Sequence, residues 1–156
     1  LMIDLKTPLH PTIDRLIAKL EKHPEVFDPA VNPYAVRVVI TGSRPDPSAF
    51  GEFPHFISFD GFIDVEYTPE QLERVALISE PFCRYAKWKG GPEPLPAQEK
   101  QVIEQLIAKS HKAGKPIRFW CSPDNAVAWE TFRKLGIDII NTDQPEACTL
   151  YFQQNP

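Results

Sequence analysis

The chain has 156 residues, of which 42% are hydrophobic and 24% are charged, a composition that is typical of one globular domain with a sizeable core. A formal net charge of -4 and the absence of a basic cluster exclude the electrostatic surface that nucleic-acid binding needs, so no nucleic-acid partner is expected. No apolar run approaches the roughly 20 residues that a membrane-spanning helix requires.

Apolar runs rich in β-branched residues alternate with stretches of helical periodicity along the chain. The predicted strands, in chain order, lie within 1–8, 34–42, 55–61, 75–79, 115–124 and 137–141. The predicted helices are 11–23, 68–75, 97–114, 125–136 and 144–154. Pro11 and Pro145 suit the first turn of a helix, and Gly114 and Gly136 suit helix ends.

This order of apolar strands and helices predicts an α/β fold with a parallel sheet covered by helices. A (β/α)8 barrel takes about 250 residues, or roughly 31 per unit, so 156 residues hold about five units. We therefore predict an incomplete TIM (β/α)8 barrel of about six parallel strands. Residues 1–156 would form a single domain, the C-terminal portion of a longer barrel.

Polar residues follow every predicted strand. They are Asp4 and Lys6, Thr41 to Arg44, Asp60, Ser79 and Glu80, Ser122 and Asp124, and Asn141 to Asp143. Ligands of parallel α/β sheets bind beyond the carboxyl ends of the strands, so these residues predict one polar rim. Helix N-capping is the alternative role for Asp60, Asp124 and Asp143. A buried ion pair is the alternative for Asp4 and Lys6, which point to one strand face.

The three cysteines, Cys83, Cys121 and Cys148, show no CxxC spacing and so indicate no zinc site. Isolated buried thiols are favoured, and one disulfide with a free thiol is the alternative. His23 and His111 lie near predicted helix ends, where a cation is favourable, and are expected at the surface.

The segment from Ile117 to Ala147 resembles the last two βα units of the glycerophosphodiester phosphodiesterase superfamily, which includes phosphatidylinositol-specific phospholipase C-like proteins. Trp120, Leu135 to Asp138, and the Thr-Asp-x-Pro turn of Thr142 to Pro145 follow the order and spacing of that family. "LMIDLKT" resembles its Glu-x-Lys strand, with aspartate at position 4 in place of glutamate. The similarity extends from residue 1 to about residue 152.

The resemblance implies a metal-dependent phosphodiesterase of lipid metabolism that cleaves a small phosphodiester or a lipid head group. It implies that Asp4 is a ligand of a divalent metal, calcium or magnesium, and that Lys6 is a catalytic contact to the phosphate. Arg44 and Arg118 are candidate anion contacts. Trp120 is a candidate apolar wall beside the substrate, with a packed aromatic of the barrel as the alternative. The shorter aspartate side chain places direct metal ligation by Asp4 in question.

The family's catalytic histidines lie on strands that precede the Glu-x-Lys strand, and none of the four histidines here matches them. We therefore expect the chain to be inactive by itself. The alternative is a non-catalytic ligand-binding domain or a degenerate barrel. Resemblance to secreted bacterial members favours a periplasmic or extracellular location, and open sheet edges would allow self-association.

Overall fold

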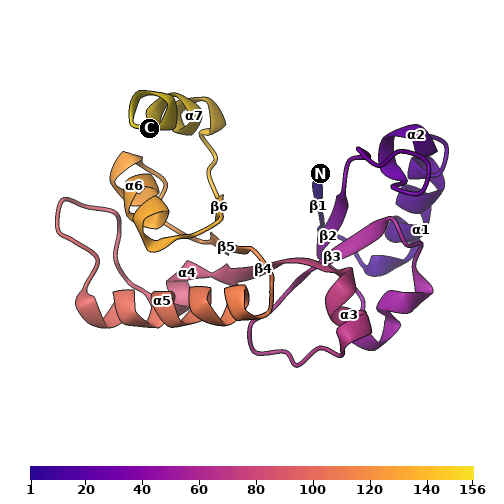
Figure 1. Ribbon diagram of the computed structural model, residues 1–156, viewed down its shortest axis with the longest axis horizontal. Coiled ribbons are helices and arrows are strands. Elements are labelled where there is room, and N and C mark those ends of the chain that lie inside the picture. Colours follow the sequence, from indigo (N-terminus) through magenta and orange to yellow (C-terminus); the bar gives the residue numbers. More distant parts are fainter. The chain divides into compact units, whose positions relative to one another are not determined.

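The computed structural model describes residues 1–156 and divides into two compact units (Figure 1). The first unit comprises Leu1–Gly61 and Val65–Ala76, and the second comprises Phe62–Asp64 and Leu77–Pro156. Each unit contains parallel strands covered by helices, which confirms the predicted α/β class. The single-domain assignment stays a prediction.

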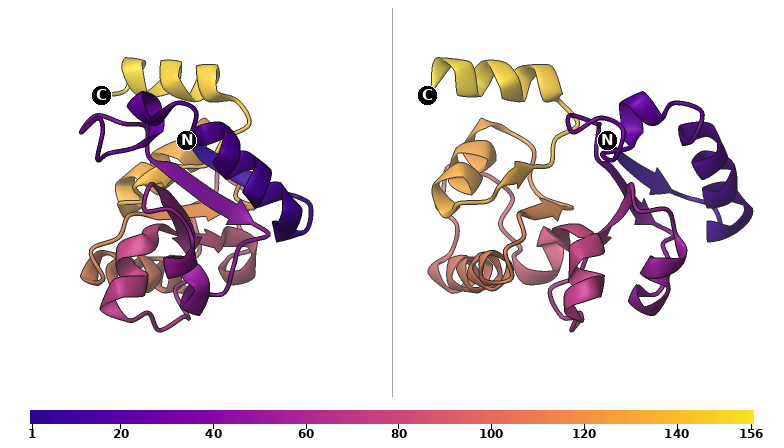
Figure 2. Two further views of the ribbon diagram at one scale, coloured as in Figure 1. Left: turned by 90° about the vertical axis from the view of Figure 1, so that its right-hand side faces the viewer. Right: turned by 45° about the vertical axis from the view of Figure 1, so that its right-hand side comes forward.

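The first unit contains three parallel strands in chain order, β1 (Met2–Leu5), β2 (Val38–Gly42) and β3 (Ile57–Gly61). Its helices are α1 (Leu9–Leu20), α2 (Pro24–Phe27), the 3-10 helix η1 (Pro47–Glu52) and α3 (Pro69–Arg74). Helices α1 and α3 contact the strands β1 and β3 of their own unit (Figure 2). Arg74 of α3 fixes the turn before β3, because its guanidinium donates to the carbonyls of Phe53, Pro54 and Ile57.

The register of the first unit places Ile3, Ile40 and Phe59 side by side. Phe59 stacks on Phe50 of η1 with ring centroids 4.2 Å apart, so this row of side chains faces the helical layer. Side chains alternate between the two faces of a strand, so the neighbouring row points to the opposite face. That neighbouring row contains the polar strand ends.

The second unit contains β4 (Val75–Pro81), β5 (Ile117–Trp120) and β6 (Ile139–Ile140), which are parallel and again in chain order. Of β4, the residues from Leu77 onward belong to this unit. Its helices are α4 (Phe82–Tyr85), α5 (Ala97–Lys112), α6 (Ala126–Leu135) and α7 (Pro145–Gln154). Phe119 of β5 packs edge-to-face on Phe82, which packs in turn on Phe132 of α6. Helix α7 packs on α6 through Trp129 and Tyr151.

The predicted long elements appear close to their expected bounds, and Gly136 ends α6 in the left-handed conformation (φ 83°). Helix α1 begins earlier than predicted, at Leu9, with a kink at His10 and Pro11. The short elements α2, η1 and α4 were not predicted, because four to six residues are too few to show a helical period.

The cysteines correct one expectation. Cys83 of α4 and Cys121, which follows β5, form a disulfide, and Cys148 is a buried free thiol. The favoured prediction of isolated thiols is therefore wrong for this pair. Among the helices, none combines the length and the apolarity that crossing a lipid bilayer requires.

Candidate functional site

A row of polar side chains crosses the carboxyl ends of the strands in the first unit. Asp4 is in register with Thr41, whose hydroxyl donates to Asp60 Oδ2 over 2.7 Å. These three side chains therefore lie next to one another on the face opposite Ile40 and Phe59. The prediction that strand ends gather polar groups holds within this unit.

Asp4 and Lys6 form an ion pair at the end of β1. Lys6 Nζ lies 2.6 Å from Asp4 Oδ2, and the two side chains are 82% and 44% exposed. The alternative of a buried ion pair is therefore wrong. Gly42 permits this arrangement, because it has a φ of 78° and a Cβ there would lie 2.3 Å from Asp4 Oδ1.

Arg44 and Asp60 form a second pair that is nearly buried. Arg44 Nη1 donates to Asp60 Oδ1 over 2.9 Å, and the side chains are 14% and 4% exposed. With Thr41 on the other carboxylate oxygen, Asp60 has a bond at each oxygen. The role of Arg44 as a substrate contact stays a prediction, and in the structure Arg44 is bound to Asp60.

Asp4 is the candidate metal ligand in this row of side chains. Asp4 is the exposed carboxylate of the row, and the structure contains no group of three or more His, Cys, Asp or Glu side chains that could hold a metal. Water and substrate oxygens can complete the coordination of a hard divalent cation, so the metal-binding role of Asp4 stays a prediction.

Arg118 and Trp120 mark the strand ends of the second unit. Arg118 is in register with Ser79, donates to the Ser79 hydroxyl over 3.0 Å and also donates to the Asn141 side-chain oxygen. Its guanidinium thus spans from β4 to the residue that follows β6. Trp120 lies two residues further on the same face, with 43% of its surface exposed. A planar cation beside an exposed aromatic ring suits an anionic ligand with an apolar part.

Asp124 joins the loop that follows β5 to the residues that follow β6. The Asp143 amide donates to Asp124 Oδ2 over 2.8 Å, and Trp129 Nε1 donates to Asp124 Oδ1 over 2.7 Å. Burial raises the pKa of Asp124, but hydrogen bonds from Thr142, the Asp143 amide and Trp129 outweigh it, so the pKa lies below its ordinary value. Neither aspartate is an N-cap, since Asn125 precedes α6 and Gln144 precedes α7.

Glu80 does not belong to the predicted rim. It is in register with Phe119, which faces the helices, and it is only 1% exposed. Its carboxylate accepts hydrogen bonds from the Ile63 amide (2.7 Å) and the Tyr85 hydroxyl (2.8 Å). Burial, reinforced by Glu80, raises the pKa of Tyr85 to about 12. Glu80 therefore stabilises the helix side of the second unit.

The four histidines lie away from the strand ends, and each contacts a carboxylate. The pairs are His10–Asp14, His23–Glu25, His55–Asp28 and His111–Asp138. His23 and His111 have side chains that are 58% and 45% exposed, which confirms their predicted surface location. The pairing of His55 with Asp28 has no local signal in the sequence, because the two are 27 positions apart.

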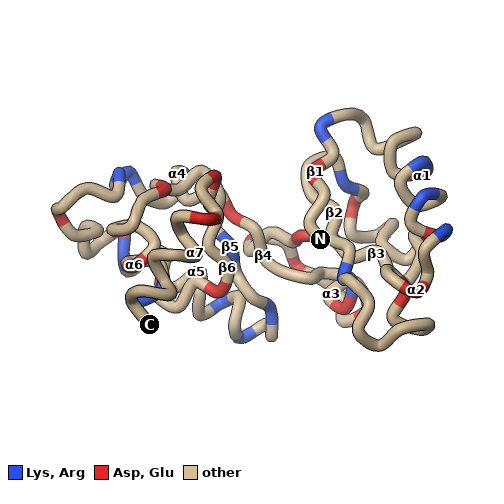
Figure 3. The backbone as a smooth tube through the Cα atoms, turned by 90° about the horizontal axis from the view of Figure 1, so that it is seen from above, with Lys and Arg blue, Asp and Glu red and all other residues tan.

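Acidic and basic residues are distributed along both units (Figure 3).

A comparison of the chain with protein-family models, with curated proteins and with solved structures finds no match.

Proposed function

We propose that this chain is the C-terminal part of a metal-assisted phosphodiester hydrolase, a (β/α)8 barrel similar to glycerophosphodiester phosphodiesterases. The observation that carries the proposal is the exposed Lys6–Asp4 pair, 2.6 Å apart, at the carboxyl end of β1. An ammonium group there can bind a phosphoryl oxygen, and the adjacent carboxylate can face a cation.

In this proposal the residues of the chain bind and orient the diester. Lys6 contacts a non-bridging phosphoryl oxygen and stabilises the charge that builds up as water attacks phosphorus. Arg44 holds Asp60 in the same row of strand-end side chains of the first unit. The P–O bond to the alcohol breaks as the bond to water forms, and the alcohol leaves with a proton.

A calcium or magnesium ion would polarise the phosphoryl oxygens when bound. Within this chain, Asp4 is the carboxylate that would contribute to such a site. By the resemblance, the other ligands and the groups that transfer protons would lie on strands that precede the Glu-x-Lys strand.

A periplasmic or extracellular location belongs to the same proposal. The Cys83–Cys121 disulfide supports it, because disulfides persist mainly in oxidising compartments. Association of two chains through open sheet edges is part of the proposal as well.

The test is hydrolysis of glycerophosphodiesters by the intact protein with calcium or magnesium, then with a chelator. Lys6→Ala should lower kcat/KM by about 100-fold, the scale of losing one transition-state donor, while the exposed Lys19→Ala serves as the matched control. The 156-residue chain alone should be inactive. Activity that survives both the chelator and Lys6→Ala would overturn the proposal.

The second candidate is a non-catalytic domain that binds an anionic ligand. The specific observation in its favour is that Arg118, which bonds to Ser79 and Asn141, and the 43% exposed Trp120 lie on one strand face. Titration of the 156-residue chain with glycerophosphate separates the two candidates. Binding that is lost in Arg118→Gln but kept in the exposed Arg84→Gln, with no hydrolysis by the intact protein, supports this second candidate.

A further inference from the structure

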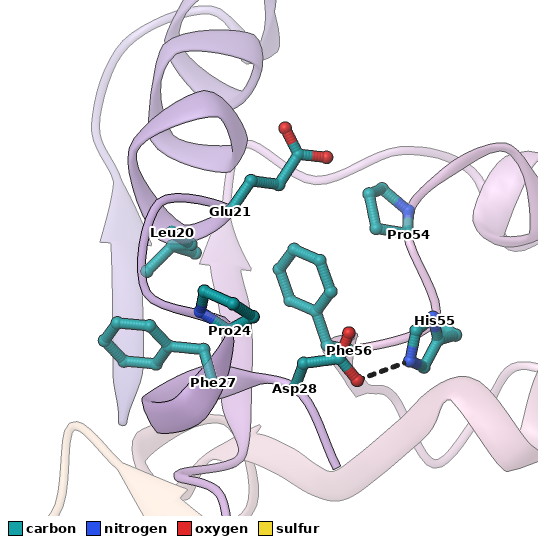
Figure 4. Close-up of a pocket in the computed structure, with 8 residues that line it drawn as sticks. All are labelled: Leu20, Glu21, Pro24, Phe27, Asp28, Pro54, His55 and Phe56. Carbon is teal, nitrogen blue, oxygen red and sulfur yellow. Dashed lines mark hydrogen bonds and ion pairs between the residues drawn. The ribbon is translucent and has the colours of Figure 1, made fainter. Parts of the chain in front are cut away.

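A pocket of about 270 Å³ lies in the first unit, away from the strand ends described above (Figure 4). It is bounded by the end of α1, by α2 and by the turn that precedes β3, whereas the candidate site follows β3. Its volume equals that of about nine water molecules, at roughly 30 Å³ each. The pocket can therefore hold a molecule the size of one ring with a short substituent.

Carbon-rich side chains form most of the pocket wall. They are Leu20, Pro24, Phe27, Pro54 and Phe56. Figure 4 shows the Phe56 ring between the end of α1 and the turn that carries Pro54 and His55. An apolar wall with two aromatic rings favours a hydrocarbon body and can attract a cation to a ring face.

The pocket is held in shape before any ligand binds. His55 Nε2 lies 2.8 Å from Asp28 Oδ1, which connects the turn before β3 to the residue after α2. The same oxygen accepts the Ala30 amide over 2.8 Å. A preorganised wall lowers the entropy that binding has to offset.

The polar groups left open in the pocket are hydrogen-bond acceptors. Both bonds to Asp28 use Oδ1, so Oδ2 has no hydrogen-bond partner, and in Figure 4 it lies on the side of the carboxylate toward Phe56. Every fully buried side-chain polar atom has a partner, so Oδ2 is open to the pocket or to solvent although the Asp28 side chain is only 19% exposed. The Glu21 carboxylate lines the pocket and makes no ion pair in the structure.

The charge of the pocket is negative. The amide of Ala30 and, against a small effect of burial, the contact with His55 hold the pKa of Asp28 below its ordinary value, so it is ionised at neutral pH. Glu21 adds a second carboxylate to the lining. The basic residues of this part of the chain, Arg15, Lys19 and Lys22, do not line the pocket.

We propose that this pocket binds a small organic ammonium ion, a primary amine carried on an aromatic ring or a short hydrocarbon. The ammonium group supplies a donor to Asp28 Oδ2, the Glu21 carboxylate adds negative charge at the pocket wall, and the hydrocarbon body packs against Phe56. This site is independent of the phosphodiester chemistry proposed above.

The test is an NMR titration of the isotopically labelled 156-residue chain at pH 7 with benzylamine, benzyl alcohol and benzoate. Benzylamine should shift the backbone amides of Ala30, His55 and Phe56 with a Kd of about 1 mM, the range for a fragment of this size. Benzyl alcohol should bind at least fivefold more weakly, and benzoate should not bind.

Matched variants separate charge from shape. Glu21→Gln should weaken benzylamine three- to fivefold, as for an exposed charge pair, and leave benzyl alcohol unchanged. Phe56→Leu should weaken both ligands, and Glu52→Gln, an exposed acid outside the pocket, should change neither. The proposal would be overturned if the three ligands bound equally or if the shifts were confined to other residues. It would also be overturned if no saturable shifts appeared at ligand concentrations up to 20-fold above the expected Kd.

Discussion

The Arg44–Asp60 pair allows the sharpest test of how the strand ends of the first unit are built. Asp60→Asn keeps the shape of the side chain and removes its charge, leaving the Arg44 guanidinium, 14% exposed, without the carboxylate that it contacts at 2.9 Å. Removing one partner of a buried ion pair costs about 3–5 kcal/mol. We expect a loss of about 3 kcal/mol, at the low end, because the amide oxygen can still accept one hydrogen bond.

The assay is urea denaturation at 25 °C, followed by circular dichroism, with the free energy of unfolding extrapolated to water. Thr41→Val, which removes a neutral donor from the same carboxylate, should cost only about 1 kcal/mol. The double variant Arg44→Met with Asp60→Leu removes both charges and should be more stable than Asp60→Asn.

A loss below about 1 kcal/mol in Asp60→Asn would refute the reasoning, as would a double variant no more stable than the single one. Either result would mean that the Arg44–Asp60 pair contributes less to stability than its burial implies.

Three further predictions follow from contacts in the second unit. The Cys83→Ser, Cys121→Ser variant should lose about 4 kcal/mol of stability in urea denaturation under oxidising conditions, because the disulfide closes a loop between residues 38 positions apart; an unchanged midpoint would contradict this. The pKa of Asp124 is depressed in the folded chain, so its charged form stabilises the fold above the unfolded pKa near 3.8. This stabilisation is lost as pH falls through the lower folded pKa, so Asp124→Asn should show less acid destabilisation between pH 5 and pH 2 than the parent chain. Tyr85, with a pKa of about 12, should be the last tyrosine to ionise in an ultraviolet titration, and Tyr85→Phe should remove that last step. The stabilising effect of the neutral phenol is present below pH 10 and is lost as pH rises through 12.

The regular elements were predictable because their signals are local. The helix α5 shows its apolar residues at helical spacing, and α6 ends at Gly136 as the sequence indicates. The α2, η1 and α4 segments escaped prediction, since helices of four to six residues depend on what they pack against more than on their own pattern. Phe82 of α4, for example, is 1% exposed between Phe119 and Phe132.

The face of the sheet to which a strand-end side chain points is predictable where two such residues are two positions apart on one strand. Asp4 and Lys6 share a face because they are two residues apart, and Arg118 and Trp120 do so for the same reason. Glu80 was placed at the rim by its position after an apolar run. Its register with Phe119 places it among the helices instead, where it accepts hydrogen bonds from Ile63 and Tyr85.

By itself the sequence determined the α/β class, the order of the long elements and the supply of polar groups at the strand ends, since all three follow from spacings of a few residues. The tertiary structure alone decided which of those groups meet. Arg118 reaches Ser79 across 39 positions and Asn141 across 23, and Asp28 reaches His55 across 27. Such contacts depend on which strands lie side by side and in which register, and a local pattern of residue types does not encode that choice.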